Sequence, residues 1–134
     1  FTFTGNTMKK IFSEGSPKAI GPYAHAIQAG NLVFCSGQTP LNPQTMQIEG
    51  ATVFEQTQRV LENLETVLRS AGCHRQHVVK TSVFLKNFAD FERMNQAYAA
   101  FFGDHKPART TVEVSRLPRE ALVEIECVAE IPAP

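Results

Sequence analysis

The chain has 134 residues, 43% hydrophobic and 19% charged, and its 13 basic and 13 acidic side chains give a formal net charge of zero. This length fits one domain. No apolar run approaches the roughly 20 residues of a membrane-spanning helix, which argues against an integral membrane protein. The neutral charge balance argues against a non-specific nucleic-acid binder, because such proteins carry a basic excess. We therefore expect one domain with neither a membrane nor a nucleic acid as its partner.

The chain contains three cysteines, Cys35, Cys73 and Cys127. An odd number at unrelated spacings does not indicate a disulfide framework and favours a reducing compartment, so we expect a cytoplasmic protein. No charged segment followed by an apolar stretch marks a secretory signal. Met8 resembles a natural start. We take residues 8–134 as the single domain and residues 1–7 as an extension that is vector-derived, native or disordered.

Two short strands are the first elements that the sequence predicts. The segments from Tyr23 to Ala29 and from Leu32 to Ser36 are rich in apolar residues, and Gly30 and Asn31 between them are typical of a hairpin turn. The prolines and polar residues that follow, over 37–50, indicate a loop.

The strongest periodic signal begins at Thr52. Apolar residues recur with the i, i+4, i+7 spacing of an amphipathic helix as far as Ala71. Thr52 and Glu55 match a capping box, and Gly72 stands where a glycine commonly ends a helix. A second helix is predicted to end before Gly103, and its apolar stripe contains one polar residue.

That polar residue is Asn95, in the stripe of the helix predicted over 91–102. A buried asparagine must find hydrogen-bond partners. Asn95 is therefore either a structural link or a residue of a functional site.

Three further strands complete the predicted fold, over Val78 to Leu85, Arg109 to Val114 and Ala121 to Glu130. The order is two strands, a helix, a strand, a helix and two strands. Right-handed crossover connections then give a mixed sheet with both helices packed on one face.

The strand over 78–85 carries apolar side chains on both faces. Strict alternation places Val79, Val83 and Leu85 on one face and Val78 and Phe84 on the other. The predicted elements cover only one face of the sheet. Self-association is the natural cover for the other face.

The last two strands bring charged residues together if their apolar rows both pack on the helices. Arg109 and Thr111 then lie on the same face as Glu124 and Glu126, because side chains alternate along a strand. A guanidinium and two carboxylates beside a subunit interface could bind a carboxylate and position a water. A plain interface salt bridge explains the same residues, and on periodicity alone it is the commoner arrangement.

Other motifs carry less information. Cys73, His74 and His77 have the spacing C-H-x-x-H, but no second ligand pair at zinc spacing accompanies them, so we predict no metal site. The glycines form neither a phosphate loop nor a dinucleotide fingerprint. Ser36 and Gly37 lack the G-x-S-x-G context of a nucleophile elbow.

The chain resembles the RidA/YjgF family of reactive intermediate deaminases, also labelled endoribonuclease L-PSP. The resemblance runs from about Phe12 to the C-terminus and rests on these segments: IGPY at 20–23, CSGQTP at 35–40, VKTSVF at 79–84, MNQAY at 94–98, PARTTVEV at 107–114, LP at 117–118 and VEIE at 123–126. The paired PAR…EVxRLP and EIE segments are highly specific to that family.

The resemblance implies an α/β (α+β) fold of the chorismate-mutase-like type, a homotrimer, and active sites in the clefts between subunits. The implied activity is that of a 2-iminobutanoate/2-iminopropanoate deaminase. Such a hydrolase converts 2-imino and 2-enamino acids of the 2-aminoacrylate or 2-aminocrotonate type to 2-oxoacids and ammonia. The implied mechanism needs neither a metal nor an organic cofactor. The expected partners are these small molecules and further copies of the chain.

The resemblance also assigns residues by position. Arg109 matches the arginine that binds the substrate carboxylate, and Glu124 matches the glutamate that positions or activates water. Three other residues match positions that line the same cleft: Tyr23, Ser36 and Asn95. Thr111 matches a further substrate-binding position, where many members have a cysteine. Its backbone can still contribute there, but any role for a thiol at that position is lost.

Two other function classes remain open on the sequence. One is a ribonuclease or translation inhibitor, as the older family label implies, although no paired histidines or basic stripe support it. The other is a ligand-binding or chaperone-like trimer without turnover. The presence of both Arg109 and Glu124 favours the enzyme, because a passive binder would need the arginine but not the water-positioning carboxylate.

Overall fold

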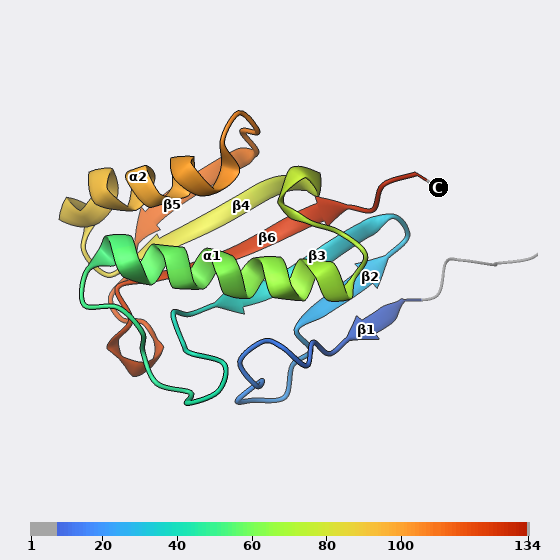
Figure 1. Ribbon diagram of the computed structural model, residues 1–134, viewed down its shortest axis with the longest axis horizontal. Coiled ribbons are helices and arrows are strands. Elements are labelled where there is room, and N and C mark those ends of the chain that lie inside the picture. The colour runs from blue at the N-terminus through green and yellow to red at the C-terminus, as the bar shows by residue number, and fades with distance from the viewer. Residues whose placement is uncertain (1–7, 134) are drawn as a thin grey trace, which may run out of the picture.

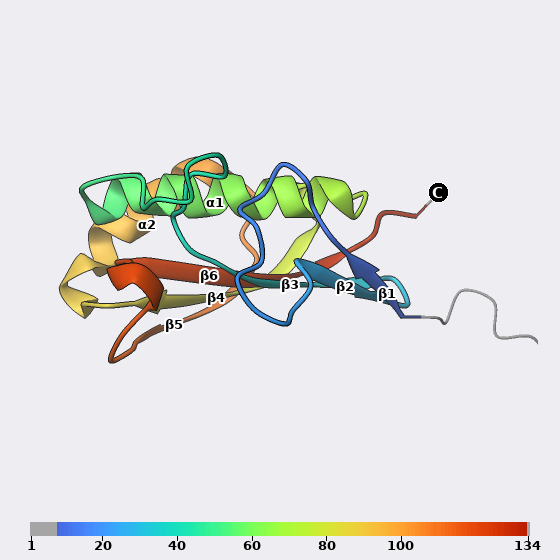
Figure 2. The ribbon, with the colours of Figure 1, turned by 90° about the horizontal axis from the view of Figure 1, so that it is seen from below.

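A computed structural model describes residues 8–133 of the chain. Within these residues, one sheet of six strands carries the helices α1 and α2 on a single face (Figures 1 and 2). The strands are β1 (Lys9–Ile11), β2 (Ala26–Ala29), β3 (Leu32–Gln38), β4 (Val78–Leu85), β5 (Ala108–Glu113) and β6 (Val123–Glu130). The helices are α1 (Val53–Ser70) and α2 (Phe91–Phe102), with the short 3-10 turns η1 (Arg75–His77), η2 (Phe88–Asp90) and η3 (Pro118–Glu120).

The strand order across the sheet is β1-β2-β3-β6-β4-β5. All neighbouring strands run antiparallel except β4 and β5, which run parallel and are joined through α2. The C-terminal strand β6 therefore lies in the middle of the sheet, and β5 forms an edge. This arrangement confirms the mixed sheet with both helices on one face that the sequence predicts.

The ends of α1 follow the predicted caps. The Thr52 hydroxyl accepts a hydrogen bond from the Glu55 N–H at 3.2 Å, and the Glu55 carboxylate accepts one from the Thr52 N–H at 3.2 Å. This reciprocal pair satisfies two amide groups that a helix N-terminus leaves free. Gly72 has a φ of 79°, a left-handed conformation that favours glycine, and the chain turns there toward β4.

The core lies between the helices and the sheet. The apolar stripe of α1 forms one cluster with side chains that alternate along β3, β4 and β6. Burial of each valine or leucine contributes about 1.5–3 kcal/mol. The fully buried members include Val33, Val60, Leu61, Val67, Leu68, Val83, Leu85, Val123 and Ile125. This core fixes which face of β4 and β6 is turned toward the helices.

The faces of β4 differ in one respect from the prediction. Val83 and Leu85 are buried under the helices as expected, but Val79 is 44% exposed and Val78 is buried. The reason is an irregularity in the pairing of β4 with β6 between Val78 and Lys80, which interrupts the alternation of side chains.

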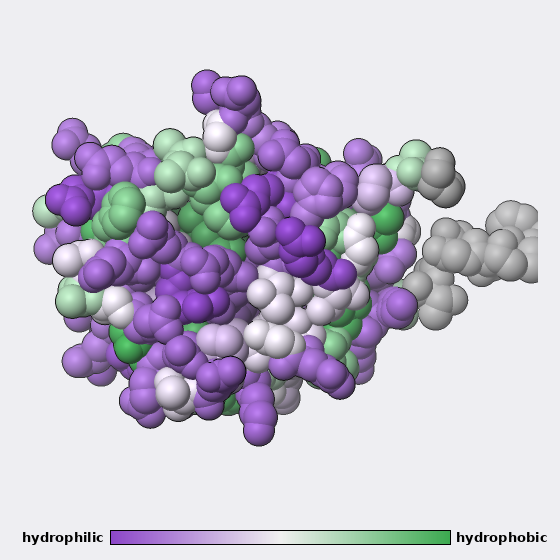
Figure 3. All heavy atoms as spheres, viewed as in Figure 1, coloured by the Kyte–Doolittle hydropathy of each residue, from purple (hydrophilic) through white to green (hydrophobic). Residues whose placement is uncertain are grey.

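The face of the sheet opposite α1 and α2 has no helix over it among residues 8–133 (Figure 2). Large apolar side chains are exposed on this open face, with Phe34 at 45% and Val112 at 41% exposure. The helix-bearing face is mainly hydrophilic (Figure 3). Exposed aromatic and aliphatic groups on a strand face are typical of an interface, so the homotrimer stays a prediction that this surface supports.

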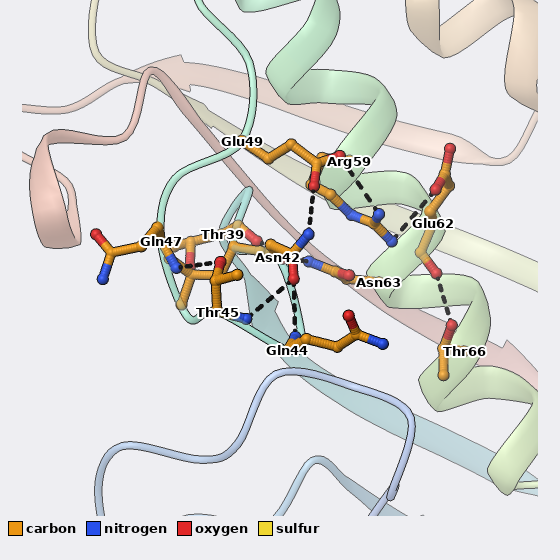
Figure 4. A network of polar contacts seen from close by, with 11 residues as sticks. Thr39, Asn42, Gln44, Thr45, Gln47, Glu49, Arg59, Glu62, Asn63 and Thr66 are labelled. Carbon is orange, nitrogen blue, oxygen red and sulfur yellow. Dashed lines mark hydrogen bonds and ion pairs between the residues drawn. The ribbon is translucent and has the colours of Figure 1, made fainter.

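A polar network holds the loop after β3 against α1 (Figure 4). The Asn63 side chain donates to the carbonyl oxygens of Thr39 and Leu41 at 3.1 and 2.9 Å. Asn42 accepts hydrogen bonds from the amides of the following turn and donates to Glu49 at 2.8 Å. The loop thereby keeps a fixed position next to the end of β3.

The sequence missed β1, whose three residues pair with β2 at the sheet edge. A strand this short leaves almost no periodic signal. The expectation about residues 1–7 lies outside the residues that the structure describes. None of the helices described is both long and apolar enough to cross a membrane.

Candidate active site

Arg109 lies on β5 with its guanidinium against α2. Its Nη1 donates a hydrogen bond to the Asn95 side-chain oxygen at 2.7 Å. The guanidinium carbon lies 4.8 Å from the ring centre of Tyr98 and 5.5 Å from that of Phe91, within the range of cation–π attraction. A guanidinium has five N–H donors. Within residues 8–133 the Arg109 guanidinium makes this one hydrogen bond, so its other N–H groups remain available to a ligand.

Tyr98 gives Arg109 a rigid platform. Its phenol oxygen shares a 2.7 Å hydrogen bond with the Thr81 hydroxyl, which is fully buried on β4. Burial raises the pKa of the Tyr98 phenol, so the ring stays neutral. The guanidinium therefore rests on a fixed aromatic face rather than beside an anion.

A cavity of about 280 Å³ opens next to Arg109. Its walls are mainly apolar and are made by Asn95, Tyr98, Ala99, Phe102, Gly103, His105, Lys106, Pro107 and Arg109. An apolar pocket with a few convergent polar groups is the usual form of a small-molecule site. Here the polar groups include the Arg109 guanidinium and the Asn95 amide that orients it.

Thr111 lies on the same face of β5 as Arg109, opposite the buried Val83 of β4. Its hydroxyl oxygen is buried and has no hydrogen-bond partner within residues 8–133. A buried hydroxyl without a partner is costly, and Thr111 is not one of the residues that line the cavity beside Arg109.

Glu124 lies on β6 and faces the open side of the sheet. A hollow of about 460 Å³ surrounds it, lined by Ile20, Tyr23, Ser36, Gly37, Thr39, Pro118, Glu124 and Glu126. Partial burial raises the pKa of the Glu124 carboxyl, and the neighbouring charge of Glu126 raises it further. A carboxylate with a raised pKa accepts a proton from water more readily than an ordinary surface carboxylate does.

Tyr23 and Ser36 are two of the wall residues of that hollow. The Ser36 hydroxyl donates to the Ala24 carbonyl oxygen at 2.7 Å, and the Ser36 amide donates to the His25 carbonyl oxygen at 2.9 Å. The hydroxyl proton of Ser36 is thus occupied, while its oxygen can still accept a hydrogen bond. Tyr23 is exposed, and its phenol oxygen accepts a 3.4 Å bond from the Ile20 amide.

The prediction that Arg109 and Glu124 share a face is wrong. Arg109 pairs with Thr81 of β4, whereas Glu124 pairs with Phe84. Positions 81 and 84 of a regular strand point to opposite faces. Arg109 therefore lies on the helix side of the sheet and Glu124 on the open side.

The reason lies in β5. The prediction assumed that the apolar row of this strand would pack on the helices, but Val112 is 41% exposed on the open face. The half-buried Arg109 takes the helix side instead, because its planar guanidinium stacks on aromatic rings and its aliphatic stem packs against apolar groups. The Asn95 amide supplies the hydrogen bond that this position requires.

The structure thus divides the predicted site residues into two half-sites. The first half-site, on the helix side, contains Asn95, Arg109 and Thr111. The second half-site, on the open face, contains Tyr23, Ser36 and Glu124. No single chain brings all of these residues into one cavity.

Sequence reasoning missed two parts of these half-sites. The sequence analysis gives Phe91 and Tyr98 no role beside Arg109, although their spacing of four and three residues from Asn95 places all three on one face of α2. Gly37 belongs to the CSGQTP segment of the resemblance but receives no role from the sequence, although it lies directly against the Glu124 side chain. The sequence alone gives no signal for the contact between Gly37 of β3 and Glu124 of β6.

The remaining motifs have structural roles. The His74 side chain accepts a bond from the Gln76 amide, and the His77 ring accepts one from the His74 amide, so both histidines cap η1. Among the described residues, no group of three or more histidine, cysteine or acidic side chains could hold a metal ion. The three cysteines, all within the described part of the chain, are free and buried.

Comparison with known proteins gives the family. The family model described as "Endoribonuclease L-PSP" matches residues 13–131. This match spans nearly the whole chain and includes both half-sites. The chain belongs to the RidA/YjgF family.

Individual relatives of this RidA/YjgF chain support the same assignment. A RutC family protein of Pyrococcus horikoshii is 50% identical over 119 residues, which cover 89% of this chain and 94% of the relative. The 2-iminobutanoate/2-iminopropanoate deaminase of Escherichia coli is 42% identical over 124 residues, covering 90% and 96%. The crystal structure of E. coli TdcF with bound serine has a TM-score of 0.86 and 38% identity, covering 91% and 98%. These names support a RidA-type activity on a small molecule.

Proposed function

We propose that this protein hydrolyses reactive 2-imino and 2-enamino acids to 2-oxoacids and ammonia, at a site that two copies of the chain build together. The observation that carries the proposal is the pair of half-sites. One offers a cationic fork for a carboxylate, and the other offers a carboxylate that can hold a water.

The Arg109 half-site suits an amphipathic anion. A planar guanidinium can bind a carboxylate by two parallel hydrogen bonds, which fixes the orientation of the attached carbon. The Asn95 amide and the two rings hold the fork in one plane before a ligand arrives. The apolar cavity beside it has room for the side chain of an imino acid.

The Glu124 half-site suits the activation of water. Partial burial and the charge of Glu126 raise the pKa of Glu124, so its carboxylate can take a proton from a water that attacks a carbon. Ser36 and Tyr23 offer further oxygens within the same hollow. These groups can hold a water but not the substrate carboxylate, because the hollow already contains two acidic side chains.

Contact between copies would complete the site. β5 is an edge strand and carries Arg109, which lines one cavity, while Glu124 lines a hollow on the uncovered face. If the edge of one copy lies against the open face of the next, the two half-sites meet. Head-to-tail contacts of this kind can close into a ring. We propose a ring of three copies, the homotrimer that the family resemblance implies.

The reaction then proceeds by hydrolysis of the C=N bond. An enamine first takes a proton from water at its β-carbon and loses one from nitrogen to water, which gives the neutral imine. A water held by Glu124 forms the C–O bond, gives a proton to the carboxylate, and the C=N electron pair moves to nitrogen. That proton passes to nitrogen, and transfer of the hydroxyl proton to nitrogen accompanies formation of C=O and release of ammonia. Positioning and electrostatics are the contributions of Arg109 and Glu124.

A coupled assay tests the proposal. A serine dehydratase generates 2-aminoacrylate, and pyruvate release is followed with and without this protein. We expect that the protein accelerates pyruvate release, that the rate reaches a plateau as the protein concentration rises, and that a 2-oxoacid product inhibits the acceleration. No acceleration above the uncatalysed rate would contradict the proposal. Cleavage of a single-stranded RNA under the same conditions would instead support the ribonuclease label of the family.

A further inference from the structure

Gly37 lies where the Glu124 carboxylate needs space. A Cβ atom built on Gly37 would overlap the Glu124 Oε2 atom and lie 3.0 Å from Cδ and 3.3 Å from Cγ. Real Cβ atoms essentially never lie as close to another atom as this Cβ would lie to Oε2. The carboxylate thus occupies the volume that any other residue would fill with its own side chain.

The backbone itself does not demand glycine at this position. Gly37 is not among the glycines with a positive φ, so an L-residue can adopt its conformation. Gly37 lies in a bulge of β3, where Ser36 and Gly37 stand between the paired residues Cys35 and Gln38. A bulge re-aims side chains near functional sites, and here it places bare backbone beneath Glu124.

This contact sets the surroundings of the carboxylate. Lying flat on β3, the Glu124 side chain is partly shielded from water, and this burial is the main cause of its raised pKa. The other titratable groups of the hollow are Glu126 and Tyr23. On β4, Lys80 lies on the same face, but its Nζ donates to the Thr110 hydroxyl at 2.8 Å.

We propose that Gly37 is a positioning residue: because it has no side chain, the Glu124 carboxylate can lie against the backbone of β3, in the orientation that lets it activate water. The catalytic part of this proposal rests on the function proposed above. Its geometric part concerns only the chain itself and does not depend on the substrate.

The substitution Gly37→Ala tests this role with little risk to the fold. The atoms that must move are the far end of one flexible side chain, and alanine is better tolerated than glycine inside a strand. Gly15→Ala is the matched control. Its Cβ would meet a Thr66 methyl group at 3.1 Å, its φ is likewise not positive, and it lies beside α1 away from both half-sites.

The first measurement is an NMR titration of the Glu124 carboxyl carbon, assigned with Glu124→Gln. We expect Gly37→Ala to lower the pKa of Glu124 toward its ordinary value, because the displaced carboxylate regains water, while Gly15→Ala leaves it unchanged. An identical pKa in the wild type and in Gly37→Ala would overturn the inference. This result stands whether or not the protein is a deaminase.

The second measurement is a double-mutant cycle on imine hydrolysis. We expect Gly37→Ala to lower kcat by about 10- to 100-fold, as misplacement of a reacting group does, with a smaller effect on KM. In a Glu124→Gln background the same change should have no further effect. An equal loss in both backgrounds would show that Gly37 acts without Glu124. An inactive wild type would instead refute the proposed function. The NMR result alone would then decide whether Gly37 positions the Glu124 carboxylate.

Discussion

The planar guanidinium of Arg109 makes two kinds of contact: aromatic rings lie near it, and one of its N–H groups donates a hydrogen bond. The aromatic rings of Phe91 and Tyr98 approach the guanidinium, and the Asn95 amide accepts one of its protons. No carboxylate among the described residues pairs with Arg109. A cation held in this way keeps its attraction for an incoming anion, which an arginine in a salt bridge would have lost.

Replacement of Arg109 should therefore be costly for catalysis. Truncating one partner of a buried, hydrogen-bonded charge pair costs about 2–5 kcal/mol, so Arg109→Ala should lower kcat/KM for 2-aminoacrylate roughly 30- to several-thousand-fold. Arg109→Lys should recover only part of the loss, because an ammonium cannot bind both carboxylate oxygens in parallel. Mass and Tm are measured on the same samples. A folded Arg109→Ala variant with the wild-type rate would remove this residue from the site.

The predicted role of Glu124 has a distinct kinetic signature. If its carboxylate activates water, Glu124→Gln lowers kcat while binding of a 2-oxoacid product stays nearly unchanged. The base must be ionised, and its pKa is raised above the ordinary 4.5. In the wild type kcat should therefore fall as the pH drops through that raised pKa, and Glu124→Gln should lack this acid limb. Equal loss of product affinity would make Glu124 a support for binding instead.

At the scale of elements, one ion pair connects α1, η1 and α2. Arg75 donates to both oxygens of Glu65, at 2.7 and 2.6 Å, and to the Phe101 carbonyl oxygen at 2.8 Å. Its guanidinium carbon lies 3.9 Å from the Phe101 ring centre. Glu65 is buried, and the hydrogen bonds and charge of Arg75 lower its pKa.

The pair predicts a pH-dependent loss of stability in Glu65→Gln. A carboxylate whose pKa is lowered on folding stabilises the protein above its unfolded pKa, and this contribution disappears as the pH falls through the lowered value. At pH 7 we expect Glu65→Gln to lower the free energy of unfolding by about 1–3 kcal/mol. The difference from the wild type should shrink at a pH below 4.5, the ordinary pKa of a glutamate.

Glu62→Gln is the control on the same helix. Glu62 is 61% exposed and pairs with Arg59 at 3.2 Å. An exposed pair contributes little, so denaturant unfolding should place this variant close to the wild type. Equal effects of the two substitutions would contradict the structural role of the Glu65–Arg75 pair.

The elements themselves were largely predictable from local signals. The span of β4 and the caps of α1 agree with the sequence because capping residues and runs of β-branched residues act over a few positions. The faces of β5 were not predictable in this way. Its orientation depends on α2, which offers Arg109 two rings and an amide that lie 11 to 18 positions earlier in the chain.

The candidate site residues are predicted by resemblance, but their arrangement is not. Periodicity placed Arg109 beside Glu124, whereas the pairing of β4 with its neighbours separates them by the thickness of the sheet. The close approach of Gly37 to Glu124 joins two strands that are distant in sequence. Contacts of this kind depend on register and bulges, which a single sequence does not specify.

At the scale of the whole molecule, the open face predicts assembly. Sedimentation equilibrium should give about three times the monomer mass of 14.8 kDa. Phe34→Glu, which places a charge in the exposed apolar row, should dissociate the assembly. A wild type that remains monomeric at micromolar concentration would contradict both the interface and the shared site.

Complementation between two inactive variants tests the shared site most directly. Arg109→Ala keeps the Glu124 half-site, and Glu124→Gln keeps the Arg109 half-site, so a mixed assembly can pair one intact half from each. The two variants are unfolded together, refolded at equal amounts, and assayed for 2-aminoacrylate hydrolysis beside each variant refolded alone. Random assortment between neighbouring copies predicts recovery of about a quarter of the wild-type rate. A mixture no more active than the separate variants, with mixed assemblies shown by mass spectrometry, would contradict a site built by two copies.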